Sequence, residues 1–270
     1  MKIRTIKKCA KIMRIWEWWD KMQIIFAAVI IMALSDLNLS ESLIPLIFLG
    51  VYLPFISSYG YVINSYYDRV PDTLVGKHSE AQCFTRRQHF MFLCVLAIPA
   101  IVLPMVYDDA SIRLTGITIF LLATFYSAPP LRLKEKGILG PISAALVQRP
   151  LPFLLFALLA RPEPTLALFL FGWLTLVGLS IMFAHQVLDY ENDRKTNVNT
   201  WALEVGFPAA RKTTIATLLF LVIYMFCAPL VFTPLKGVAL SMVMIIFSGN
   251  VIAYTLHALK KEYNVEDGPE

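Results

Sequence analysis

Charged residues are scarce in this sequence, which also has no long polar linker and no low-complexity segment. Asp, Glu, Lys and Arg make up 16% of its 270 residues and hydrophobic residues 57%, whereas a soluble domain carries about a quarter charged residues. A soluble fold of this length has no core large enough to bury so much apolar surface. The composition therefore excludes a soluble globular domain and indicates a membrane protein.

Paired cysteines are also lacking. The four cysteines are Cys9, Cys83, Cys94 and Cys227. Their separation predicts neither a disulfide framework nor a zinc site. A cleavable signal peptide is not expected either, because the basic N-terminus runs into the Trp-rich stretch Ile15–Lys21 without a small-residue cleavage pattern. We expect a single membrane domain over residues 1–270, in which residues 1–21 form a basic cytoplasmic segment.

The apolar residues are gathered into continuous segments, each long enough to cross about 30 Å of hydrocarbon as a helix. The expected helices lie near residues 22–37, 41–66, 88–107, 112–128, 138–160, 164–190, 209–232 and 236–259. A transmembrane β-barrel would instead require alternating polar and apolar positions. The predicted fold is an all-α, multi-pass bundle of about eight transmembrane helices, eight or nine, around a central cavity.

The basic residues between these segments predict an orientation. Twenty Lys and Arg fall at the N-terminus, at the C-terminus and in the loops after the second, fourth and sixth helices. Only Arg113, Arg161 and Lys236 fall in the opposite loops, and Arg149 lies inside the fifth segment. The positive-inside rule therefore places both termini in the cytoplasm. The net charge of +5 reflects this topology, and we expect no nucleic-acid partner.

Oxygen-bearing side chains recur every four residues after two of the predicted helices. The first motif contains Asn64, Asp68 and Asp72, and the second contains Asp189 and Asp193. Four-residue spacing places such side chains on one helix face, about 6 Å apart. Hard oxygen ligands of this kind suit Mg²⁺, which binds few carboxylates and keeps positions for water and phosphate oxygens.

Both motifs lie on the predicted cytoplasmic side, and basic residues follow each of them. For either motif alone, a solvated helix end is the simpler interpretation. Two motifs with the same spacing on the same side favour a shared site, because two facing acidic surfaces repel each other unless a cation lies between them. We expect two Mg²⁺ ions, with the mouth of the site on the cytoplasmic side.

The motifs resemble those of one membrane family. Asn64-xxx-Asp68-xxx-Asp72 resembles the first motif of the UbiA-type intramembrane prenyltransferases, and Asp189-xxx-Asp193 resembles their second. Between them, the stretch from Tyr126 to Lys134 reads YSAPPLRLK, which is similar to the corresponding stretch of the chlorophyll-synthase-like branch. The resemblance extends over about residues 20–260, and the three motifs occur in the family's order.

The resemblance implies a Mg²⁺-dependent transfer of an isoprenyl group from an isoprenyl diphosphate to a lipophilic, aromatic acceptor. The implied catalytic residues are Asp68, Asp72, Asp189, Asp193 and Tyr126. The implied metal ligands are Asn64, Asp68, Asp72, Asp189 and Asp193. The candidate substrate-binding residues are Asn64, Lys77, Arg132, Lys134, Arg149 and His185. Arg149 is among them because an arginine inside a membrane span needs a partner or a water-filled cavity.

Two other functions remain open. Some members of this superfamily are terpene cyclases, and such an enzyme would act on farnesyl or geranylgeranyl diphosphate with the same acidic motifs. A secondary transporter is the more remote alternative. Transport sites favour the middle of the bilayer and broken helices, whereas these carboxylates gather at one face.

Overall fold

The structure is a computed structural model that describes residues 7, 9–15, 21–35, 37, 39–74 and 84–261. Its helices are α2 (Met22–Leu34), α3 (Leu39–Tyr67), α4 (Arg69–Leu74), α5 (Arg86–Met105), α6 (Ala110–Ser127), η3 (Leu133–Glu135), α7 (Leu139–Gln148), α8 (Pro150–Ala160), α9 (Pro164–Thr196), α10 (Trp201–Val205), α11 (Phe207–Phe226), α12 (Ala228–Val231) and α13 (Pro234–Leu259). The described residues contain no strand. The prediction of an all-α bundle is confirmed.

Every predicted span coincides with one helix or with two consecutive helices, but the first is shorter than expected. Within the described residues, seven helical segments are long and apolar enough to cross a membrane: α3, α5, α6, α7 with α8, α9, α11 and α13. Helix α2 has only 13 residues and ends at Leu34, because Ser35 is extended. At 1.5 Å per residue it is about 20 Å long, which is too short to cross the hydrocarbon alone.

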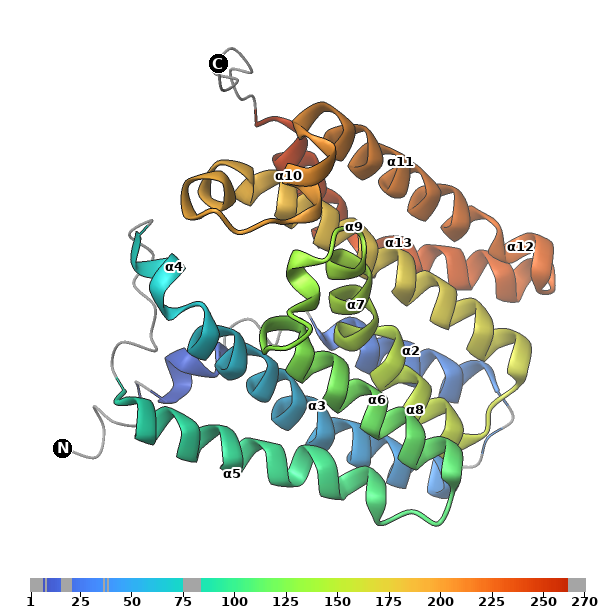
Figure 1. The fold of residues 1–270 in the computed structure, drawn as a ribbon. Helices are drawn as coiled ribbons and strands as arrows, with labels where there is room; N and C mark the ends of the chain where they lie inside the picture. The colour runs from blue at the N-terminus through green and yellow to red at the C-terminus, as the bar shows by residue number, and fades with distance from the viewer. Residues whose placement is uncertain are drawn as a thin grey trace.

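The helices form two groups, one on each side of a central pair of helices (Figure 1). One apolar cluster joins α3, α5 and α6, and includes Tyr52 and Ile119. A second joins α9, α11 and α13, and includes Trp173. The indole of Trp173 donates a hydrogen bond of 2.9 Å to Ser248 Oγ on α13, which satisfies its one polar atom in the core. Helices α7 and α8 lie between the groups.

The predicted span over residues 138–160 is not one continuous helix. It breaks at Arg149, which separates α7 from α8 with φ −140° and ψ −71°. Pro150 follows at the first position of α8, where a proline has no N–H to continue the preceding helix and clashes with its carbonyls. The break places the Arg149 side chain, which has no exposed surface, in the interior of the bundle.

Helix α7 approaches α9 closely at one glycine. A Cβ atom on Gly178 would lie 3.0 Å from the carbonyl oxygen of Ala145. Only a residue without a side chain allows this distance without moving one of the backbones. The close contact fixes α7 against the wall formed by α9.

Basic residues are segregated between the two ends of the bundle. The α5–α6, α8–α9 and α11–α13 connections lie at one end, and α4 and α10 lie at the other (Figure 1). The first end carries Arg113, Arg161 and Lys236, whereas Arg194 and Lys195 close α9 at the second. The three-dimensional arrangement therefore keeps the charge asymmetry of the sequence.

Candidate active site

The bundle encloses a cavity of about 1190 Å³ that opens between its two helix groups. Helices α2, α3, α6, α7, α9 and α13 line it, together with residues of the N-terminal segment. Apolar side chains contribute to several of its walls, among them Ile56, Leu122, Val147, Ile181 and Phe247. Polar side chains line the rest of it, including members of the two predicted motifs.

The first predicted motif lies at the end of α3, and two of its members line the cavity. Asn64 accepts a hydrogen bond of 2.5 Å from Ser127 Oγ, which fixes its amide oxygen beside the end of α6. Asp68 is nearly buried and forms an ion pair with Lys134. The third member, Asp72, lies in α4, but its side chain is outside the described part of the structure.

The second motif lies on α9, on another wall of the same cavity. Asp189 and Asp193 both line it, and Asn192 Nδ2 lies 3.5 Å from Asp189 Oδ1. His185 Nε2 lies 3.4 Å from Asp189 Oδ2, and its Nδ1 lies 3.3 Å from the hydroxyl of Tyr254 on α13. The predicted juxtaposition of the two motifs across one cavity is present.

Tyr126, near the end of α6, and Lys134, in η3, also line the cavity. Arg132 precedes η3 with a left-handed φ of +42°. Its Nη2 lies 2.5 Å from Glu135 Oε1 and 4.0 Å from Asp68 Oδ1. Arg132 is therefore within ion-pair distance of Asp68 but is not among the described residues that line the cavity. The remaining basic candidate, Lys77, lies outside the described residues.

Asn64, Asp68, Asp189 and Asp193 line one part of the cavity, which we call the acidic end. Its donor chemistry fits a hard divalent cation. Asn64, Asp68, Asp189 and Asp193 present amide and carboxylate oxygens to one space, and these are the ligands that Mg²⁺ takes in proteins. No three His, Cys, Asp or Glu of the described residues converge as a closed metal site. An open site of one or two carboxylates per ion, completed by water and phosphate oxygens, is the arrangement that Mg²⁺ favours. The ammonium of Lys134 supplies the positive charge at Asp68.

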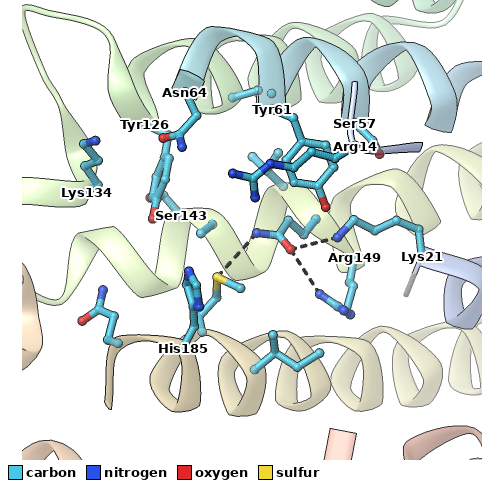
Figure 2. A pocket seen from close by; sticks show the side chains of 18 of the residues that line it. Arg14, Lys21, Ser57, Tyr61, Asn64, Tyr126, Lys134, Ser143, Arg149 and His185 are labelled. Atoms are coloured by element: carbon cyan, nitrogen blue, oxygen red, sulfur yellow. Dashed lines mark hydrogen bonds between the residues drawn. The ribbon is translucent and has the colours of Figure 1, made fainter. Parts of the chain in front are cut away.

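A second polar cluster in the cavity lining is basic (Figure 2). Lys21 Nζ and Arg149 Nη1 both donate to Gln148 Oε1, at 3.0 and 3.4 Å. Arg149 Nε donates to Gln23 Oε1 at 3.2 Å. Arg14 lies over the ring of Tyr61 at 5.3 Å. We call Arg14, Lys21 and Arg149 the basic cluster.

Sequence reasoning found the acidic end and one member of the basic cluster, Arg149. It missed Asn192, although this residue lies three positions after Asp189 and therefore on the same face of the helix. It treated Arg14 and Lys21 only as markers of topology. No pattern in the sequence signals that the N-terminal segment enters a cavity formed mainly by later helices.

Together, the fold and the site define a multi-pass membrane protein with oxygen donors at one end of an internal cavity. The chain matches the model of the UbiA prenyltransferase family over residues 24–268. It belongs to this family and is an integral membrane protein. No curated protein sequence gives a significant match to the chain.

Solved structures of similar fold cover nearly the whole chain. A UbiA homolog from Archaeoglobus fulgidus bound to GPP and Mg²⁺ has 17% sequence identity and a TM-score of 0.66, covering 94% of this chain and 100% of that chain. The same homolog bound to DMAPP and Mg²⁺ gives 17% identity and a TM-score of 0.65, with the same coverage. A structure described for digeranylgeranylglyceryl phosphate synthase in membranes gives 14% identity and a TM-score of 0.63, covering 96% and 100%.

Proposed function

We propose that this protein transfers an isoprenyl group from an isoprenyl diphosphate to a lipophilic acceptor within the membrane, with Mg²⁺ as its cofactor. The observation that carries the proposal is the placement of two oxygen-donor motifs on different walls of one largely apolar cavity. Similarity to a UbiA homolog described with GPP or DMAPP and Mg²⁺ supports it.

The acidic end would receive the diphosphate. Mg²⁺ held by Asn64, Asp68 and Asp72, and by Asp189 and Asp193, would supply positive charge against the diphosphate oxygens. Lys134 would then move its hydrogen bonds from Asp68 to a phosphate oxygen, and Arg132 and Lys77 would add positive charge nearby. The role of these chain residues is to orient the diphosphate so that its allylic carbon C1 points into the cavity.

The apolar depth of the cavity would hold the isoprenyl tail and exclude water. When the C1–O bond breaks, its electron pair leaves with the diphosphate, and the resulting allylic cation is open to attack by water. The ring of Tyr126, which lines the cavity, offers an aromatic face to this cation. The acceptor nucleophile then forms a bond to C1 and loses its proton.

We infer that the acceptor is aromatic and that the mouth of the cavity faces the cytoplasm, with both termini on that side. The second inference is supported by the gathering of basic residues at the α4 and α10 end of the bundle, because positive charge is retained on the cytoplasmic side. Residues 1–270 act in this proposal as one catalytic domain.

Product analysis tests the proposed reaction. The purified protein, in phosphatidylcholine nanodiscs, is given geranylgeranyl diphosphate and Mg²⁺ with and without a pool of phenolic and quinol acceptors, and the extracts are analysed by mass spectrometry. We expect prenylated acceptor only when the pool is present. A cyclic hydrocarbon or alcohol formed without acceptor would identify a terpene cyclase instead. No turnover in either reaction, with wild type and Asp68→Ala indistinguishable, would direct attention to transport.

A further inference from the structure

The carboxylate of Asp189, in the second motif, is contacted on both of its oxygens. Oδ1 lies 3.5 Å from the amide Nδ2 of Asn192, and Oδ2 lies 3.4 Å from Nε2 of His185. Asn192 and His185 lie on the same helix, α9, about one turn after and one turn before Asp189. Contacts on both oxygens fix the direction in which a carboxylate presents its lone pairs.

Tyr254 reaches this site from the last helix, α13. Its hydroxyl lies 3.3 Å from Nδ1 of His185, and both residues line the cavity. Figure 2 shows the imidazole of His185 pointing from α9 into the cavity. The hydrogen bond between Trp173 and Ser248 joins the same two helices at another level. The position of Tyr254 beside His185 is therefore set by the packing of α13 on α9 and not by a motif within one helix.

The hydroxyl of Tyr254 can decide which nitrogen of His185 is the donor toward Asp189. In a neutral imidazole, one ring nitrogen carries the proton and the other accepts a hydrogen bond. When the hydroxyl donates to Nδ1, the proton lies on Nε2, and the N–H points at the carboxylate. In the opposite tautomer the lone pair of Nε2 would face a negative oxygen, which is unfavourable. The contact with Asp189 therefore requires no positive charge on the imidazole.

We propose that Tyr254 is a positioning residue of the second motif: through His185 it holds the carboxylate of Asp189 in the orientation that binds Mg²⁺. This inference rests on the proposed function, because it adds an outer contact to the Mg²⁺ site proposed there. Outer partners that orient metal ligands commonly contribute about 10- to 100-fold to metal affinity. The side chain of His185 is 55% exposed, so we expect an effect near the lower end of this range, about tenfold.

The Mg²⁺ dependence of donor binding tests this role without turnover. The protein in phosphatidylcholine nanodiscs is titrated by calorimetry with geranyl S-thiolodiphosphate, a donor analogue that does not ionise readily, at a series of Mg²⁺ concentrations. We expect Tyr254→Phe to raise the Mg²⁺ concentration that gives half-maximal binding about tenfold. At saturating Mg²⁺ it should bind the analogue like wild type, because the ring that packs α13 is retained. An unchanged Mg²⁺ midpoint would overturn the inference.

Tyr224→Phe is the matched control, because it removes the same group from another helix. The hydroxyl of Tyr224 donates a hydrogen bond of 2.9 Å to the carbonyl of Phe169, and Tyr224 does not line the cavity in the described structure. This variant should keep the Mg²⁺ midpoint of wild type. A shift as large as that of Tyr254→Phe would assign the effect to any lost hydroxyl in the bundle, and the specific role of Tyr254 would be wrong.

A double-substitution cycle tests whether Tyr254 acts through His185. His185→Ala should raise the Mg²⁺ midpoint at least as much as Tyr254→Phe does. Adding Tyr254→Phe to His185→Ala should then cause no further change, because residues that act through one contact are not additive. Additive shifts would mean that Tyr254 acts independently of His185, which would contradict the proposed role.

Failure of this inference is distinguishable from failure of the proposed function. If wild type does not bind the donor analogue at any Mg²⁺ concentration, the proposed function fails, and the role of Tyr254 fails with it. If wild type binds the analogue with Mg²⁺ and Tyr254→Phe has the same midpoint, only the role of Tyr254 is wrong.

Discussion

Lys134 and Asp68 form an ion pair at the entrance of the cavity, although 66 residues separate them in the chain. Their side chains are only 9% and 13% exposed. Lys134 thus places a positive charge beside one of the proposed metal ligands. The pair balances the charge of Asp68 and leaves Asp189 and Asp193, on the other wall, outside this contact.

Removing the cation of this pair should destabilise the protein. We expect Lys134→Met to destabilise the protein by about 1–3 kcal/mol, because it leaves the nearly buried Asp68 with only the more distant guanidinium of Arg132, at 4.0 Å. Added Mg²⁺ should then raise the melting temperature more in Lys134→Met than in wild type. Thermal unfolding in nanodiscs measures both effects. Lys136→Met is the control, because Lys136 is exposed, and equal stability of the two variants would contradict this account.

The activity should depend on the carboxylates of the second motif and not on a neighbouring carboxylate of the same helix. We expect Asp193→Asn to lower the rate of diphosphate release at least about 100-fold, because it removes a charged ligand from the proposed metal site. Glu191→Gln should retain most of the activity, since Glu191 pairs with Arg194 at 3.3 Å and does not line the cavity in the described structure. Diphosphate release is followed by a coupled phosphate assay. Equal losses in both variants would indicate a general effect of negative charge on this helix.

The close approach of α7 to α9 should make Gly178 sensitive to size. Gly178→Val should destabilise the protein by about 1–3 kcal/mol, because its side chain must displace the backbone of Ala145. Gly249→Ala should be neutral or stabilising, since a Cβ at Gly249 meets no atom within 4 Å and alanine favours a helix. Melting temperatures in one detergent compare the two. A stable Gly178→Val would mean that α7 is free to move away from α9.

The proposed orientation can be tested by labelling single cysteines. In a chain whose four native cysteines are replaced by serine, Arg161→Cys should react with an impermeant maleimide in intact cells, and Lys195→Cys should react only after permeabilisation. Arg161 directly follows α8 and Lys195 lies in the last turn of α9, so the 33-residue α9 separates the two positions. The positive-inside rule places Lys195 in the cytoplasm. The reverse pattern would invert the proposed topology.

Much of this structure follows from local sequence features. The positions of the helices are set by long apolar runs, and the two oxygen-donor motifs lie at helix ends because their four-residue spacing has helical periodicity. The branch motif from Tyr126 to Lys134 predicts a second source of positive charge, and Lys134 indeed pairs with Asp68.

Other features depend on tertiary packing. The break at Arg149 was absent from the prediction, although Pro150 and Pro152 are visible in the sequence, because apolar composition alone does not distinguish a broken span from a continuous one. The entry of Arg14 and Lys21 into the cavity depends on where the N-terminal segment packs. Charge counting uses such residues only for topology, so it does not predict that Arg14 and Lys21 line the cavity.

Calorimetric titration of a donor analogue that does not ionise readily tests whether the two acidic motifs form one Mg²⁺-dependent diphosphate site. Geranyl S-thiolodiphosphate is titrated into wild type, Asp68→Asn, Asp189→Asn and Glu191→Gln, each with and without Mg²⁺. We expect tight binding only with Mg²⁺, loss of this binding in both aspartate variants, and binding by Glu191→Gln that matches wild type. Binding that is independent of Mg²⁺, or that survives in both Asp68→Asn and Asp189→Asn, would contradict a diphosphate site shared by the two motifs.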